Sequence, residues 1–252
     1  MTRSLIVPNP WTELRRFTPA RIALGRVGAS LPTDEVLRFG LAHARARDAV
    51  YRTLDVDALS AALEHAGFKN LRVKSNALDR ASFLLRPDLG RSLDALSEET
   101  LRAVQTASCD IVFVIADGLS AAAVQQHAVP LIGAASASLP GMVIGPIVIA
   151  EQGRVALGDS IGELLVARFV IMLIGERPGL SSPHSMGIYL TRDPKIGRTD
   201  AERNCISNVR PDGLTPALAA RKLAWLIGAA RRIGATGVVL KDQSGIQELP
   251  EA

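Results

Sequence analysis

The sequence predicts an α/β fold: a Rossmann-like, mostly parallel sheet flanked by helices, preceded by a smaller, mainly helical N-terminal domain. Continuous apolar runs at Ile111–Ile115, Ile147–Ile149 and Phe169–Ile174 are typical of strands buried on both faces of a parallel sheet. Helical patterns separate these runs, as in a doubly wound sheet. Only 4% of the 252 residues are aromatic, so the core is built mainly from aliphatic side chains, which favours α/β or helical packing over an aromatic-rich β-sandwich.

The first hundred residues predict helices. Thr33 is expected to cap a helix whose first turn carries Asp34 and Glu35, because the positive end of the helix dipole favours acidic residues. Leu37 and Leu41 give this helix an apolar stripe.

Two shorter helices follow in the same part of the chain. One covers Asp57–Ala66 and stops at Gly67, and another opens at Ser97 and runs to about Ala107. Because the apolar strands begin directly afterwards, we expect a helical domain over residues 1–107 and an α/β domain over residues 108–252.

Further elements are expected between and after the three apolar runs. Leu119–Ala128 is predicted to be helical, and Asp159 is expected to cap a helix that runs to Val166. Short strands are predicted at Gly187–Leu190 and Gly237–Leu240.

The last helix has the clearest boundaries. Thr215 precedes Pro216, which suits the first helical position, and Gly234 ends the helix. The side chains expected to point inward are Leu218, Trp225, Leu226, Ala229 and Ile233.

The stretch from Gly118 to Ala150 contains no Lys, Arg, Asp or Glu and is long enough to cross a bilayer. However, Pro130, Pro140 and Pro146 interrupt it, and such a density of proline would leave backbone groups unsatisfied in lipid. We therefore predict the buried interior of an α/β domain and no membrane span.

Several kinds of chemistry have no counterpart in this sequence. There is no GxGxxG, GxxxxGK[ST] or HExxH motif, and the four histidines are scattered. Two cysteines, Cys109 and Cys205, form neither a disulfide framework nor a CxxC zinc pair, which fits a reducing cytoplasm. The net charge is +4, and acidic residues are interspersed among the basic ones, unlike the dense basic face of a nucleic-acid binder.

Two polar loops remain as candidates for a ligand site. They cover residues 175–182 and 200–208, and the first of them directly follows an apolar strand. Ligands of open α/β sheets bind beyond the carboxyl ends of the strands, but these residues alone are equally compatible with simple turns.

These loops closely resemble the small subunit of ethanolamine ammonia-lyase, and so do four other stretches in the same order along nearly the whole chain. The matching stretches are Gly175–Leu180, Arg203–Asn208, Arg16–Arg26, Ser75–Arg80, Asp88–Arg91 and Asp110–Val129.

The resemblance implies a function in a two-chain enzyme. In this family a large barrel subunit holds ethanolamine, and the small subunit closes over adenosylcobalamin at the interface. The cofactor supplies an adenosyl radical, and ethanolamine is converted to acetaldehyde and ammonia. The resemblance thus implies a cofactor-binding subunit without catalytic residues or metal ligands of its own.

Three positions match the family's cofactor contacts. Val155 is expected to lay an apolar surface against the corrin, and Glu176 to accept hydrogen bonds from the cofactor's amides. Cys205 is expected to pack as a small neutral residue. Because thiols donate hydrogen easily to carbon radicals, we expect Cys205 to lie away from the adenosyl group.

One near match concerns the base of the cofactor. Other cobalamin proteins carry Asp-x-His-x-x-Gly, in which the histidine replaces the cofactor's own base. Here Ser182 takes the place of the aspartate before His184 and Gly187, so the imidazole lacks its orienting carboxylate. We therefore expect the cofactor to keep its own base on cobalt.

Other interpretations remain open. The chain is alternatively an independent enzyme with a nucleotide-type cofactor, or a nucleic-acid-binding module on the strength of its arginines. As a small subunit, it should expose an apolar patch for the large subunit. A short leader precedes the stretch from Arg16, whereas some family members have a long extension linked to bacterial microcompartments, so a free cytosolic enzyme and a packaged one both stay possible.

Overall fold

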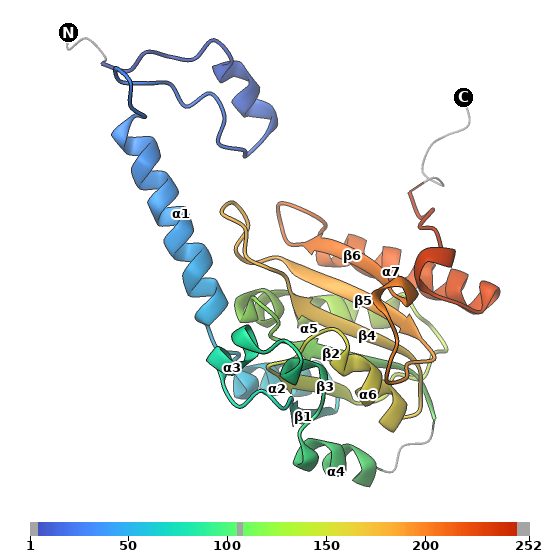
Figure 1. Ribbon diagram of the computed structural model, residues 1–252. Helices are drawn as coiled ribbons and strands as arrows, with labels where there is room; N and C mark the ends of the chain where they lie inside the picture. The colour runs from blue at the N-terminus through green and yellow to red at the C-terminus, as the bar shows by residue number, and fades with distance from the viewer. Residues whose placement is uncertain (1–4, 105–107, 246–252) are drawn as a thin grey trace, which may run out of the picture.

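The computed structural model describes residues 5–104 and 108–245, and a six-stranded sheet with helices on both faces dominates it (Figure 1). The strand order is β1-β3-β2-β4-β5-β6. The first four strands are mutually parallel, and β5 pairs antiparallel with both β4 and β6. The strands are β1 (Asn70–Lys74), β2 (Cys109–Ala116), β3 (Ile147–Glu151), β4 (Ala167–Gly175), β5 (Met186–Arg192) and β6 (Asn204–Val209). The predicted α/β class with a mostly parallel sheet is confirmed.

Helices bury both faces of the central strands, which explains their continuous apolar runs. The first face of the sheet packs against α2 (Val56–His65), α5 (Ala121–Ala137) and α7 (Pro216–Ile233). The second packs against α4 (Ala95–Ala103) and α6 (Leu157–Leu164).

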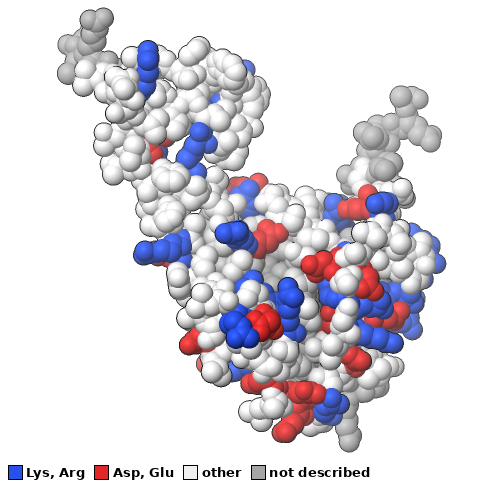
Figure 2. Space-filling model, in the orientation of Figure 1, with Lys and Arg blue, Asp and Glu red and all other residues white. Residues whose placement is uncertain are grey.

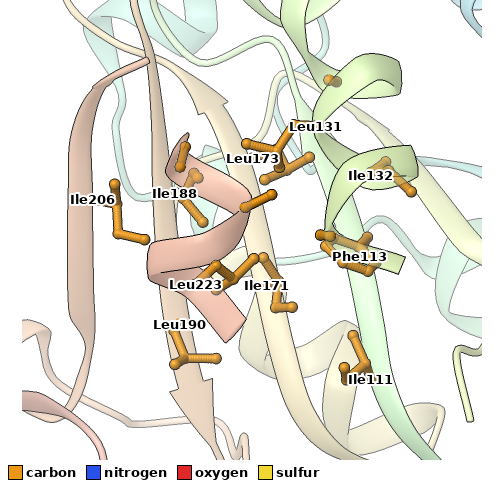
Figure 3. Packing of buried hydrophobic residues seen from close by; sticks show 14 of the residues in the cluster. Ile111, Phe113, Leu131, Ile132, Ile171, Leu173, Ile188, Leu190, Ile206 and Leu223 are labelled. Carbon is orange, nitrogen blue, oxygen red and sulfur yellow. The ribbon is translucent and has the colours of Figure 1, made fainter. Parts of the chain in front are cut away.

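Side chains of β2 alternate between these two layers. Ile111 and Phe113 point to the first face, where Leu131 of α5 and Leu223 of α7 also lie (Figure 3). Val112 belongs to the core on the other face. The period of two places every residue of the run in one core or the other.

The last helix is largely as predicted. Thr215 caps α7 by accepting a hydrogen bond from the Leu218 backbone N–H, and Gly234 ends the helix in the left-handed conformation. Leu226 is buried as expected. The inward orientation of Leu218 was wrong, because the buried face of α7 begins one residue later.

Of the other residues of α7 predicted to point inward, only Ile233 differs from the prediction. Ala229 is buried and Trp225 packs partly buried against the first core, as expected. Ile233 is exposed, because it lies in the final turn, beyond the part of α7 that contacts the core.

Two predicted helices have different boundaries. α5 continues past Ala128 and Pro130 to Ala137, because burial of Leu131 and its neighbours offsets the backbone hydrogen bond that proline cannot make. α6 begins at Leu157, so Asp159 lies inside its first turn and does not cap it.

The predicted strand at Gly237–Leu240 was wrong, because this segment forms the short 3-10 helix η4 (Gly237–Val239). Gly237 has φ of 85°, and its N–H donates to the Asn204 side-chain oxygen at 2.8 Å. A side chain therefore takes the place of a strand partner.

Two edge strands were not predicted. In both β1 and β6 only some of the side chains are buried, so neither strand has a continuous apolar run. β1 pairs in parallel with β3 and thus joins the sheet although it precedes residue 108. The division into residues 1–107 and 108–252, and the description as Rossmann-like, stay predictions.

The N-terminal part has helices, as expected, with altered boundaries. α1 (Thr33–Tyr51) has Pro32 at its cap position, so the capping role of Thr33 was wrong: Pro32 already has the extended backbone that a cap requires. α2 begins at Val56, one residue before the predicted Asp57, and Asp55 caps it by accepting a hydrogen bond from the Ala58 N–H. α4 ends at Ala103, and residues 105–107 of its predicted extension lie outside the described residues.

α1 extends away from the sheet and carries the N-terminal segment, including the 3-10 helix η1 (Thr12–Phe17), at its far end (Figure 1). Ala49 is the buried residue of this helix. The apolar stripe that includes Leu37 and Leu41 therefore faces outward.

The charge-free stretch from Gly118 to Ala150 includes α5 and β3, which supply buried core residues as predicted, whereas Val143 in the turn between them is 59% exposed. Within residues 5–104 and 108–245, none of the helices has both the length and the apolar character needed to cross a membrane.

Candidate functional site

At the carboxyl ends of β2 and β3 the chain leaves two neighbouring strands in opposite directions, and we call this switch point of the sheet the β2–β3 crevice. The chain after β2 enters α5 on the first face, and the chain after β3 enters α6 on the second face. Such divergence at adjacent strand ends is where open α/β sheets bind ligands. Asp117 follows β2, and residues 152–155 follow β3.

Val155 lies in the turn between β3 and α6. Its side chain is half-buried and packs against the core of the second face, and its carbonyl accepts a hydrogen bond from the Gly158 N–H at 3.1 Å. The residue is therefore held at the crevice by a turn and not by a strand.

Glu176 directly follows β4, and its carboxylate is fixed from two directions. Ser185 donates its hydroxyl to Oε2, and the backbone N–H of Asn208 donates to Oε1 at 3.2 Å. The Glu176 N–H in turn donates to the Ser185 carbonyl at 2.9 Å. The carboxylate thus joins the loop after β4 to the end of β6.

Gly187 provides the space that this carboxylate occupies. A Cβ atom at Gly187 would lie 3.2 Å from Glu176 Oε1 and 3.4 Å from a ring carbon of Tyr189. A methyl group here would therefore require the Glu176 carboxylate or the Tyr189 ring to shift by a few tenths of an ångström.

Cys205 lies opposite Tyr189 in the antiparallel pair β5–β6. Although Cys205 is an exposed residue, the surrounding protein desolvates the sulfur and raises its pKa; a hydrogen bond with Tyr189 opposes this shift, and the charge of Glu176 adds to it. Burial and the neighbouring Cys205 and Glu176 also raise the pKa of Tyr189 to about 12. Both groups are therefore neutral at pH 7.

A buried ion pair holds the beginning of β6 in place. Arg203 donates to both carboxylate oxygens of Asp159 at 2.6 Å each, and to the Thr191 hydroxyl at 3.0 Å. Because Arg203 lies two residues before Cys205, this contact fixes β6 against β5 and α6.

The structure thus places two of the three predicted residues next to the same side chain. Glu176 and Cys205 share Tyr189 as a neighbour, whereas Val155 lies further along the same face of the sheet, at the β2–β3 crevice. Sequence reasoning missed Tyr189, Gly187 and the Asp159–Arg203 pair. These contacts depend on long-range pairing: β5 with β6 for Tyr189, β4 with β5 for Gly187, and α6 with the start of β6 for the ion pair. The sequence predicts a strand at Gly187–Leu190 but a loop at residues 200–208, so it does not reveal them.

No cluster of three or more metal-ligating side chains occurs among the residues that the structure describes. A hollow of about 1110 Å³ opens at the opposite edge of the sheet, near Lys69 and Gly145, at the amino ends of the parallel strands. The predicted residues therefore line an open face of the sheet and not this hollow.

The fold and the placement of these residues define an α/β protein whose predicted site residues lie at the carboxyl edge of its sheet and on an uncovered face of β5 and β6. The family model for the ethanolamine ammonia-lyase light chain (EutC) matches residues 8–241. The chain belongs to this family, and it is a subunit of ethanolamine ammonia-lyase, a carbon–nitrogen lyase.

Close relatives agree along nearly their full length. The chain is 52% identical to the ethanolamine ammonia-lyase small subunit of Azotobacter vinelandii, covering 99% of this chain and 94% of that protein. It is 53% identical to that of Pseudomonas fluorescens strain Pf0-1, over 96% and 90%. The small subunit of Ralstonia nicotianae is 52% identical, over 97% and 93%.

Proposed function

We propose that this chain binds adenosylcobalamin through Val155, Glu176 and Cys205, on a pocket that the large subunit completes. The observation that carries the proposal is the continuous face of Glu176, Tyr189 and Cys205 beside the β2–β3 crevice. It is open on one side, as half of a shared pocket must be.

The chemistry of these residues fits an amide-bearing corrin. Glu176 is already oriented by Ser185 and Asn208, and its remaining lone pairs accept hydrogen bonds from amides. Val155 offers an apolar surface, and the neutral thiol of Cys205 packs without a desolvated charge.

When bound, the cofactor supplies the radical that converts ethanolamine to acetaldehyde and ammonia. This chain binds and orients the corrin and excludes water from one side of it, and we assign it no catalytic residue. Cys205 lies with Tyr189 on β5–β6, and we propose that the adenosyl group lies on the other side, toward the large subunit.

His184 is exposed in the loop after β4, and no carboxylate among the described residues is hydrogen-bonded to it. An imidazole that replaces the cofactor's base needs such an orienting partner. We therefore propose that the cofactor keeps its own base; a spectrum of the assembled enzyme with histidine nitrogen on cobalt contradicts this.

We propose that the large subunit docks on α1 and the N-terminal segment. On α1, Leu37 is 66% and Leu41 is 52% exposed, and large apolar side chains continue through Trp11 and Phe17. On the face visible in Figure 2, uncharged residues make up most of this projecting part. Exposed apolar surface of this kind favours association.

Changing Leu37→Ser and Leu41→Ser together should make the isolated chain more soluble and weaken its association with the large subunit at least tenfold. Co-purification and sedimentation measure both effects. Unchanged association places the docking surface elsewhere. Thr100→Ser, an exposed position on α4, serves as the control.

The alternatives predict different behaviour. An independent enzyme releases ammonia from ethanolamine without a partner, whereas we expect none. Blue and red side chains are interspersed over the face visible in Figure 2, and this face therefore lacks the dense basic surface that is typical of a nucleic-acid binder. Two free cysteines fit our proposal of a reducing, cytosolic location, free or within a microcompartment.

The proposal is tested by co-expressing the chain with a family large subunit and assaying cobalamin-dependent deamination. We expect activity only with both chains, and at least a tenfold loss with Glu176→Leu. A complex that remains fully active with Glu176→Leu refutes the proposed role of this carboxylate.

A further inference from the structure

Three arginines from separate segments converge at the β2–β3 crevice. Arg80 begins α3 (Arg80–Leu85), Arg91 ends the 3-10 helix η2 (Leu89–Arg91), and Arg154 follows β3. The proposed corrin face uses none of them.

A buried aromatic ring holds two of these side chains together. The guanidinium carbon of Arg80 lies 4.8 Å from the centre of the Phe83 ring, and that of Arg154 lies 4.1 Å from it. Arg154 Nη2 also donates to the Phe83 carbonyl at 3.1 Å. Arg154 is thus fixed in place before any ligand arrives.

The loop that carries Arg91 is tied to the same point. The Arg154 backbone N–H donates to the Gly90 carbonyl at 2.8 Å. A Cβ at Gly90 would lie 2.8 Å from Arg154 Cγ and 3.0 Å from the Gln152 carbonyl oxygen, so glycine is needed for this close approach. The two segments form one rigid edge of the crevice.

The cluster carries more positive charge than its partners neutralise. Arg80 pairs with Asp117 at 3.3 Å, but within the described part of the chain neither Arg91 nor Arg154 makes an ion pair. Burial and the charges of Arg80 and Arg91 lower the pKa of Arg154. Arg80 Nη2 and Arg154 Nε are buried without a hydrogen-bond partner.

We infer that Arg91 and Arg154, with Arg80 behind them, bind a phosphate-type anion, namely the phosphodiester that adenosylcobalamin carries in its nucleotide loop. This inference rests on the proposed function and adds a second contact to it. Guanidinium groups match phosphate oxygens in geometry and charge, and an anion here removes the mutual repulsion of the three cations. Arg91 is exposed and Arg154 half-buried, so both are within reach of a ligand.

Arg80 has a different role. Its Nε donates to the carbonyl of Val50, in the last turn of α1, at 2.7 Å, and its Nη1 to Asp117. It therefore ties α1 to the crevice, and its replacement would disturb the fold. Arg91 and Arg154 are the informative positions.

The test compares two ligands that differ by one phosphate, adenosylcobinamide phosphate and adenosylcobinamide, bound to the complex of this chain with its large subunit. The readout is the equilibrium dissociation constant from the absorbance of the corrin. We expect Arg91→Gln and Arg154→Gln each to weaken the phosphate-bearing ligand about tenfold or more, as loss of a charge-assisted contact does. Binding of adenosylcobinamide should change less than about twofold.

Arg86→Gln is the matched control. It lies on the same segment and is exposed, but it is paired with Asp88 at 2.7 Å, so it should not alter the preference for phosphate. Equal weakening of both ligands by Arg91→Gln and Arg154→Gln overturns the inference, as does equal binding of the two ligands by the wild-type complex. If inorganic phosphate binds but gives no such preference, the site takes free phosphate and the assignment to the cofactor is also overturned. A wild-type complex that binds neither ligand refutes the proposed function itself.

Discussion

Replacing Asp159 by Asn should destabilise the protein more than any change at an exposed position. The side chains of Asp159 and Arg203 are each 2% exposed, and two hydrogen bonds of 2.6 Å join them. In Asp159→Asn the guanidinium of Arg203 loses its buried counter-charge and keeps only the exposed carboxylate of Asp200, at 3.5 Å. Breaking one side of a buried ion pair costs about 3–5 kcal/mol, and because Asn keeps one acceptor oxygen we expect about 3 kcal/mol.

The free energy of unfolding is measured by urea denaturation of the full chain at pH 7, followed by far-ultraviolet circular dichroism. With an m-value of about 2–3 kcal/mol/M, the midpoint should fall by about 1 M or more. Asp200→Asn is the control, because Asp200 also faces Arg203, at 3.5 Å, but its side chain is 95% exposed. That change should cost less than about 0.5 kcal/mol.

The reasoning is refuted if Asp159→Asn stays within about 1 kcal/mol of wild type. Such a result would mean that water reaches Arg203, or that Thr191 and the Arg198 carbonyl satisfy the guanidinium without the carboxylate.

Three further predictions concern the site. Burial raises the pKa of Asp117 to about 6, against an ordinary value of 3.8. The folded state therefore gains roughly 3 kcal/mol of stability as the pH falls from above 6 to below 4. Asp117→Asn should lose this gain, as measured by urea unfolding at pH 7 and pH 4; the same pH dependence in wild type and variant argues against it. Gly187→Ala should displace Glu176 and weaken adenosylcobalamin binding by the complex about tenfold, while unfolding of the chain shifts by less than about 1.5 kcal/mol; unaltered binding contradicts the close fit seen here. In the folded chain a maleimide should label the exposed thiol of Cys205 and leave the buried thiol of Cys109 unlabelled. Because the pKa values of both thiols are raised, labelling of Cys205 at pH 7 should be slow. Equal labelling of the two cysteines in a mass spectrum is the contrary result.

The sequence predicts the centre of this fold better than its edges. The runs around Ile111 and Phe169 are apolar at every position because helices cover both sides, and this signal does not depend on knowing the partner strands. β6 is half-exposed and contains two asparagines and a serine, so its residues resemble a polar loop. The two valines of η4 conversely make this segment resemble a strand in the sequence, although Gly237 turns the chain there.

The candidate site shows the same limit. Val155, Glu176 and Cys205 came from resemblance to a family, and the residues around them have no separate signal in the sequence. The register of β5 with β6 places Tyr189 opposite Cys205, and the ring of Phe83 brings Arg154 close to Arg80 because both guanidinium groups stack on it. Long-range pairing of this kind follows from the topology of the sheet and not from local patterns.

The central claim is that this chain contributes one side of a corrin pocket that is incomplete without it. Equilibrium binding of adenosylcobalamin tests it most directly, with the large subunit alone, with the wild-type complex and with a complex that carries Cys205→Trp. Ile196→Trp, at an exposed turn beyond the far end of β5, is the matched control. We predict tight binding by the wild-type and Ile196→Trp complexes and at least tenfold weaker binding by the other two, with subunit association unchanged; equally tight binding by the large subunit alone, or by the Cys205→Trp complex, contradicts the account.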